Sequence, residues 1–215
     1  MSEAMPGYYP VFLRVKGRRC LVVGGGEVAQ RKVEALSEAG GRVKVIAPSL
    51  TPRLSEMARA CTVEAVLRPY APGDIKGAFL VIAATDDPDT NKLVTAEARR
   101  RRVLLNVVDQ PQACSFIVPS VVRRGDLTLA ISTGGASPAL SRRVREELEG
   151  HLGPEYALLA KIAGRVRRRM RRRGGVSAAA WTRALDWELL ELLRRGEVAK
   201  AERRLEQSLT MGVTS

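Results

Sequence analysis

The chain has 215 residues, of which 45% are hydrophobic, 27% charged and only 4% aromatic. It is long enough for one large or two small globular domains, it has too few aromatic residues for a base-stacking nucleic-acid surface, and no apolar run reaches the roughly 18 residues of a membrane-spanning helix. Its net charge of +13 favours a polyanionic partner such as nucleic acid, anionic lipid or a polycarboxylate, although a solvated basic helix face is the simpler explanation.

Short apolar runs alternate with helical patterns through the first half of the chain. The patterns predict strands at 19–24, 42–48, 62–69, 77–85 and 103–109, and helices at 27–40, 49–61 and 86–101, the second of them capped by its first Ser. Strands without polar alternation, separated by helices, indicate a parallel sheet covered on both faces. We therefore expect an α/β fold with a doubly wound parallel sheet (Rossmann) over residues 1–112.

The stretch "CLVVGGGEVAQRK" ends the first predicted strand and opens the first helix. Gly24, Gly25 and Gly26, followed by Ala29, give the spacing G-x-G-x-x-A of a dinucleotide-binding turn. The first glycine permits a tight turn, Gly26 lets a diphosphate approach the backbone, and Ala29 allows the helix to pack closely on its strand. The position of this turn within the first strand–helix unit predicts a nucleotide cofactor.

Other predicted strands end in residues that would lie at the same sheet edge. The second ends at Pro48 and Ser49, where many NAD-binding domains carry an acidic residue for the ribose. Arg42 and Lys44 on this strand leave the choice between NAD and NADP open. The fourth ends at Ala84 and Thr85, whose backbone we expect to cover the cofactor.

Two acidic positions remain at this edge. Asp86 or Asp87 is expected to cap the following helix. Asp109 ends the fifth strand in "NVVDQP", beside the predicted nicotinamide position. It is a candidate to accept a proton, and a solvated turn residue is an equally good interpretation.

The pattern changes after Pro111. Residues 115–133 contain two strand-like runs joined around Gly125-Asp126, which predicts a β-hairpin. From Ser137 the chain is helical, and Gly174-Gly175 is the only obvious break within that region. We expect a dimerisation region at 113–150 and a helical C-terminal domain at 151–215.

Cysteine and histidine do not indicate a metal site. Cys20, Cys61 and Cys114 are widely spaced and form no C-x-x-C pair; Cys20 and Cys61 are expected to be buried. His151 has no partner at ligand spacing and is expected at a helix end. The start of the chain lacks the pattern of a signal peptide, so a cytoplasmic protein is expected.

Four segments together resemble one family: "YYPVFLRVKGRRCLVVGGGEVAQRK", "VIAATDD", "NVVDQPQACSFIVPS" and "ISTGGASPALSRRVREELE". They are similar to the precorrin-2 dehydrogenase (siroheme synthase dehydrogenase/ferrochelatase) module, and the resemblance runs from about Tyr9 to Arg173. It implies NAD-dependent oxidation of precorrin-2 to sirohydrochlorin, insertion of ferrous iron in some members, and a homodimer.

The resemblance also implies roles for particular residues. Asp109 matches the family's important aspartate, Glu27 and Val28 match cofactor positions after the glycine turn, and Pro48 and Ser49 match those after the second strand. A substrate with several carboxylates would suit a basic cleft, which makes the following residues of the hairpin and the "STGGASP" turn candidates for substrate binding: Arg123, Arg124, Arg142, Arg143 and Thr133. Asp109 could accept protons in both reactions.

Two other interpretations stay open at this point. The basic segment 161–173 would suit an NAD(H)-sensing regulator that binds DNA, with affinity that falls steeply with salt. A dehydrogenase of another small acid would also carry the glycine turn, but would be expected to have a larger second domain.

Overall fold

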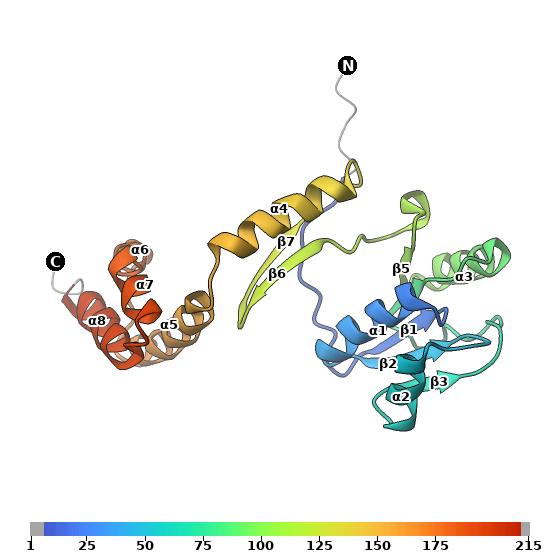
Figure 1. Ribbon diagram of the computed structural model, residues 1–215, viewed down its shortest axis with the longest axis horizontal. Helices are drawn as coiled ribbons and strands as arrows, with labels where there is room; N and C mark the ends of the chain where they lie inside the picture. Colours follow the sequence, from blue (N-terminus) through green and yellow to red (C-terminus); the bar gives the residue numbers. More distant parts are fainter. Residues whose placement is uncertain (1–6, 212–215) are drawn as a thin grey trace, which may run out of the picture. The chain divides into compact units, whose positions relative to one another are not determined.

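The computed structural model describes residues 7–211. The chain forms two compact units, the first ending at Val118 and the second beginning at Pro119. Figure 1 draws the first unit in blue through green and the second in yellow-green through red.

A five-stranded parallel sheet forms the centre of the first unit, in the order β3-β2-β1-β4-β5. Its strands are β1 (Arg19–Val23), β2 (Arg42–Ile46), β3 (Glu64–Val66), β4 (Leu80–Ala83) and β5 (Leu104–Val107). In the register, Val23 lies beside both Ile46 and Ala83, and Ala83 lies beside Val107. The carboxyl ends of these four strands therefore meet at one edge.

Helices cover both faces of this sheet (Figure 1). They are α1 (Glu27–Glu38), α2 (Pro52–Arg59) and α3 (Pro88–Arg101). Successive strand residues point to opposite faces, so Val22 packs with α1 and α2 in one buried cluster while Leu21 packs with α3 in another. The doubly wound α/β fold predicted from the sequence is confirmed.

The second unit contains the predicted hairpin and a helical region. The antiparallel strands β6 (Ser120–Arg124) and β7 (Leu127–Ile131) turn at Gly125, whose φ is +58°. The helices that follow are α4 (Pro138–His151), α5 (Glu155–Arg172), α6 (Ala178–Ala184), α7 (Trp187–Arg194) and α8 (Val198–Met211). Ile162, Leu189 and Leu205 are fully buried in the core that joins α5 to α8.

Three local predictions were wrong. Cys61 is exposed, because it follows the C-cap of α2 in a left-handed conformation with φ +54°. The cap of α2 is Thr51 and not Ser49, since the Thr51 hydroxyl accepts a hydrogen bond from the Leu54 amide. Gly174-Gly175 is not the only break beyond Pro154, because Asp186 caps α7 and a turn at Gly196 separates α7 from α8.

Within residues 7–211, no helix is both long enough and apolar enough to span a bilayer.

Candidate functional site

The predicted cofactor residues lie where the direction of strand succession reverses. The sheet order places β1 between β2 and β4, so the chain runs outward in both directions from β1. In doubly wound sheets, ligands bind outside the carboxyl ends of the strands at this point. Gly24, Ser49 and Thr85 follow the three strands concerned.

Gly24 and Gly25 hold three loops against one another. Gly24 has φ +123°, and a Cβ placed on it would overlap the carbonyl group of Ala84. A Cβ on Gly25 would overlap the carbonyl oxygen of Ser49. The Gly25 carbonyl in turn accepts a hydrogen bond of 2.9 Å from the Thr51 amide. The structure thus brings the predicted positions after β1, β2 and β4 into direct contact.

Gly26 differs from its two neighbours. Among residues 7–211, no heavy atom outside its immediate chain neighbours lies within 4 Å of a Cβ built on it. It is the N-cap of α1 and, as a glycine, has no side chain that could cap the helix amides. The first amides of a helix are donors without partners inside the helix, so this open space suits the diphosphate of a dinucleotide.

The remaining residues of the motif support the same use. Ala29 is fully buried against the sheet, as the fingerprint requires. Glu27 and Val28 form the first residues of α1, with Glu27 exposed and Val28 half-buried. Pro48 and Ser49 are exposed beside the turn. These residues fit a dinucleotide at the amino end of α1.

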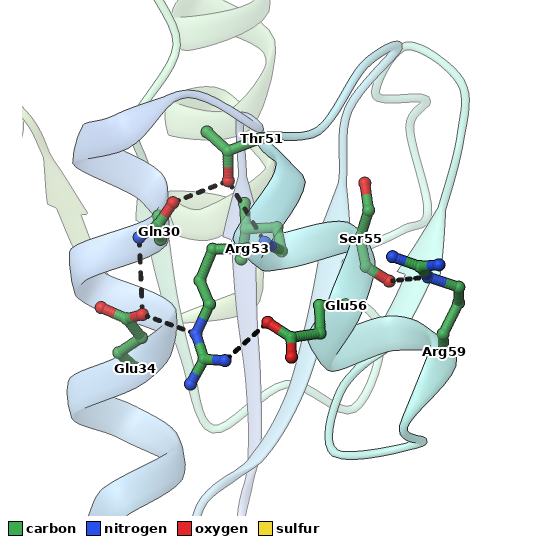
Figure 2. Close-up of polar contacts among 8 residues, drawn as sticks. Gln30, Glu34, Thr51, Arg53, Ser55, Glu56 and Arg59 are labelled. Carbon is green, nitrogen blue, oxygen red and sulfur yellow. Dashed lines mark hydrogen bonds and ion pairs between the residues drawn. The ribbon is translucent and has the colours of Figure 1, made fainter.

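Figure 2 shows how side chains fix α1 to α2 behind this turn. The Thr51 hydroxyl donates to Gln30 Oε1 over 2.7 Å while it caps α2. Arg53 bridges the two helices, with its Nε 3.4 Å from Glu34 and its Nη1 2.8 Å from Glu56. The loop that carries Ser49 is therefore held at both ends.

The loop after β4 is fixed by α3. Asp87 is the N-cap, and its carboxylate accepts from the amides of Asp89 and Thr90. Asn91, only 6% exposed, donates from Nδ2 to the Thr85 carbonyl over 3.0 Å. Within the described part of the chain, Asn91 Oδ1 is buried without a hydrogen-bond partner.

Asp109 lies at the same edge, in the turn that follows β5. It is exposed, and its φ of +58° is left-handed. Non-glycine residues adopt this conformation at a cost of roughly 1–2 kcal/mol, which asparagine and aspartate tolerate best. An exposed aspartate thus follows β5 at the sheet edge where the glycine turn also lies.

Lys32 on α1 is an ionisable residue that the sequence did not single out. It is half-buried. Burial lowers the pKa of its ammonium group, and repulsion from Arg31 lowers it further, while attraction to the Asp109 carboxylate partly offsets both. Of these three effects on the Lys32 pKa, the attraction to Asp109 is the smallest.

A hollow of about 570 Å³ lies elsewhere in the first unit, at the amino ends of β1, β2 and β3. Arg19, Arg42, Lys44 and Glu64 are among the residues that line it. The glycine turn and the amino end of α1 lie at the opposite ends of the strands, and those are the groups that bind a diphosphate. We therefore assign the candidate site to the carboxyl edge.

The predicted substrate residues all lie in the second unit and have different surroundings. Arg124 donates to the carbonyl groups of Glu149 and Leu152, so its guanidinium satisfies the end of α4. Arg142 is exposed, and Arg143 forms an ion pair of 2.9 Å with Glu147. The use of Arg124 as a helix cap was not foreseen.

Thr133 and His151 mark the two ends of α4. The Thr133 hydroxyl accepts from the Ser137 amide over 2.9 Å and donates to the Ser137 carbonyl, which closes the glycine-containing turn before the helix. His151 is the last residue of α4, as expected. Among residues 7–211, no three His, Cys, Asp or Glu side chains are placed to share a metal ion.

Sequence reasoning missed Lys32, Asn91 and Cys114 as contributors to this edge. Lys32 follows Ala29 by three residues, which places both on neighbouring positions of one helix side. That spacing was an available signal. Asn91 and Cys114 contact backbone groups of other segments, and no local pattern indicates such contacts.

Two family models match parts of the chain. A family model described as NAD(P)-binding matches residues 11–120, just over half of the chain. A second, described as the central region of sirohaem biosynthesis proteins, matches residues 124–151.

Individual relatives carry related names. The siroheme synthase of Nitrosococcus oceani is 42% identical over 208 residues, covering 95% of this chain and 44% of that protein. Siroheme synthase 1 of Serratia proteamaculans is 40% identical over 205 residues, covering 94% and 43% respectively. The chain thus spans less than half the length of these curated relatives.

A solved structure named SirC, precorrin-2 dehydrogenase, matches with a TM-score of 0.74 at 27% identity, covering 92% of this chain and 100% of that one. None of the matches described here supports a DNA-binding regulator. The motifs, the fold and the comparisons lead to one assignment: the chain belongs to the NAD(P)-binding family whose model matches half of it, and with its sirohaem-biosynthesis central region it is similar to siroheme synthases and to SirC.

Proposed function

We propose that this protein oxidises precorrin-2 to sirohydrochlorin with NAD as the hydride acceptor, a step of siroheme biosynthesis. The observation that carries the proposal is the open diphosphate position at Gly26 on the same sheet edge as the Asp109 carboxylate. The name of the matching structure, which is covered along its whole length, supports the choice of substrate.

The proposed cofactor contacts are those of the glycine turn and its two neighbouring loops. The amides at the amino end of α1 would hold the diphosphate, and Ser49 would hydrogen-bond a ribose hydroxyl. The backbone at Ala84 and Thr85 would lie beside the nicotinamide half. When bound, NAD supplies the acceptor for the hydride that leaves the substrate.

Asp109 is proposed to take the proton that accompanies the hydride. Asp109 is exposed in a left-handed turn, so its carboxylate can accept a proton from the substrate and pass it to water. The Asp109 carboxylate slightly raises the pKa of Lys32, so this lysine is proposed as a nearby cation. The electron balance is complete, because the substrate loses one hydride and one proton.

We propose Arg123 and Arg142 as contacts for the substrate's carboxylates. A guanidinium binds a carboxylate through two parallel hydrogen bonds. Arg124 and Thr133 were also predicted here, but their polar groups hold α4 and its preceding turn. They would act by shaping that turn.

The proposal extends to a cytoplasmic homodimer. Tyr9, Val11 and Phe12 are exposed apolar residues close together in the amino-terminal segment, which is typical of a surface covered by a partner. The three cysteines are free thiols, in keeping with a reducing compartment. Sedimentation velocity should give twice the chain mass, and a monomer at all concentrations would contradict the dimer.

The test is anaerobic mixing of the protein with precorrin-2 and NAD while NADH formation is recorded. We expect turnover by the wild type and a rate reduced by roughly 100-fold or more in Asp109→Asn, because proton transfer contributes about that much. Asp126→Asn, in the hairpin turn, is the matched control and should keep the wild-type rate. Absence of NADH from the wild type would reject the function.

Ferrous iron insertion is a separate reaction. No observation on the described residues favours it independently, so we confine the proposal to the oxidation.

Nucleotide binding can be measured without substrate, by fluorescence titration with NADH. That measurement separates a protein that binds no nucleotide from one that binds it but acts on another substrate.

A further inference from the structure

The Asp109 turn has an unusual support. β5 is the last strand of the sheet, so its outer backbone groups have no neighbouring strand. A segment that follows the turn covers this edge. The Leu105 amide donates to the Ser115 hydroxyl over 2.7 Å, and the Ser115 amide donates to the Leu105 carbonyl over 2.8 Å.

The Cys114 thiol takes the corresponding place nearer the turn. Its Sγ accepts a hydrogen bond from the Val107 amide over 3.1 Å. Its single S–H proton has two acceptors at 3.3 Å, the carbonyl oxygens of Val107 and Gln110. Asn106, 8% exposed, places its Nδ2 3.5 Å from the same sulfur. The thiol therefore contacts Val107, which precedes Asp109, and Gln110, which follows it.

This arrangement explains how a left-handed Asp109 persists. A non-glycine residue with positive φ is retained only where its surroundings fix the backbone. The Gln110 amide donates to the Val107 carbonyl over 3.3 Å, which is long for a hydrogen bond. The 3-10 helix at Pro111–Ala113 begins immediately after Gln110. The backbone closes this turn with one long hydrogen bond. The Cys114 sulfur adds an acceptor for the Val107 amide and a donor for the Val107 or Gln110 carbonyl.

We propose that Cys114 is a positioning residue for Asp109, which it acts on by holding Val107 and Gln110 at the two ends of the turn. The inference rests on the proposed role of Asp109 in the oxidation. Cys114 does not touch the reacting atoms. Its removal would leave the Val107 amide without an acceptor and allow the carboxylate to move, and a displacement of about 1 Å in a catalytic group can reduce the rate by roughly 100-fold.

Two variants remove the thiol in different ways. Cys114→Ala deletes the group, whereas Cys114→Val fills its space without a donor. Cys114→Ser keeps a donor and an acceptor and serves as the rescue. Cys61→Ser is the matched control, because Cys61 is an exposed cysteine of the same unit.

The rate of precorrin-2 oxidation is the first readout. We expect Cys114→Ala and Cys114→Val to lower kcat by about tenfold with an unchanged KM for NAD, and Cys114→Ser to recover most of the loss. In the Asp109→Asn background, Cys114→Ala should have little further effect. An unchanged kcat, or the same tenfold loss without the Asp109 carboxylate, would overturn the proposal.

Hydrogen–deuterium exchange of residues 104–116 is the second readout and needs no substrate. In Cys114→Val we expect faster exchange at Val107 to Ala113, with β1 unchanged. Unaltered exchange there would overturn the proposal, even if the wild type proved inactive on precorrin-2. Inactivity of the wild type counts against the proposed function alone.

Discussion

The carbonyl group of Ala84 lies against the α-carbon of Gly24, with no room for a side chain between them. This approach joins the end of β4 to the end of β1 at the reversal point of the sheet. Two residues further on, the position of a Cβ on Gly26 is free of neighbours. The same short turn therefore contains a glycine required by the fold and a glycine that leaves a binding space.

Gly24→Ala is expected to destabilise the first unit. The added methyl group would overlap the Ala84 carbonyl. The backbone would also keep a φ of +123°, which residues other than glycine rarely adopt. Overpacking and backbone strain together should lower the free energy of unfolding by about 2–5 kcal/mol. Urea unfolding followed by far-UV circular dichroism measures this loss. A midpoint equal to that of the wild type would show that the turn relaxes without cost.

Gly26→Ala should leave stability almost unchanged and weaken nucleotide binding. Its φ of −81° suits alanine, and a Cβ there has no neighbour within 4 Å among the described residues, so stability should change by about 1 kcal/mol at most. The methyl group would occupy the proposed diphosphate position, and NADH affinity should fall at least about tenfold. Fluorescence titration with NADH measures the affinity. Gly150→Ala, also in open space, is the matched control, and equal affinity in Gly26→Ala would place the diphosphate elsewhere.

The sheet edge was predictable because its signals are local. Each strand is a continuous apolar run, and the glycine spacing places Gly24 and Ala29 relative to one strand and one helix. Parallel strands must then end at a common edge, which brings Asp109 to the same side as the glycine turn. The fold of the first unit follows from these patterns without knowledge of any distant contact.

Other features depend on contacts that no local pattern encodes. Cys61 follows an apolar helical pattern, yet a left-handed turn directs it to solvent. Arg124 was grouped with possible substrate contacts, and its bonds to the end of α4 depend on how the hairpin packs on that helix. The role of Cys114 depends on a chain segment that folds back along β5.

Lys32→Met is expected to raise stability and lower activity. Burial lowers the pKa of Lys32 in the folded protein, so the unfolded chain binds its proton more tightly. The charged lysine therefore destabilises the fold below its folded-state pKa, and this penalty disappears as the pH rises through that pKa towards 10.5. The variant should melt at a higher temperature than the wild type at pH 7, and the difference should shrink in alkaline buffer.

Activity should fall in the same variant because Asp109 loses its interacting cation. We expect a several-fold decrease in kcat for precorrin-2 oxidation, of the order seen when proton transfer is disturbed. Lys92→Met removes an exposed lysine paired with Asp89 and should change neither property. A Lys32→Met protein with wild-type kcat would remove Lys32 from the site.

Glu202→Gln tests the core of the second unit. Hydrogen bonds from Arg165 lower the pKa of Glu202 to about 2, against the opposing effect of burial and with help from Arg169. Glu202 joins α8 to these two arginines of α5. A lowered carboxylate pKa adds stability above the unfolded-state value of 4.5 and loses it as the pH falls towards 2.

At pH 7 the free energy of unfolding of the variant should therefore be about 1–2 kcal/mol lower than that of the wild type. This value is reduced to allow for screening by solvent around the guanidinium groups. The difference from the wild type should narrow progressively between pH 4.5 and pH 2. Both tryptophans of the chain, Trp181 and Trp187, lie in this unit, so their fluorescence reports its unfolding selectively. Glu197→Gln breaks an exposed pair with Lys200 and should change stability by less than about 0.5 kcal/mol. A pH-independent difference for Glu202→Gln would mean that packing, and not the ionised carboxylate, joins α5 to α8.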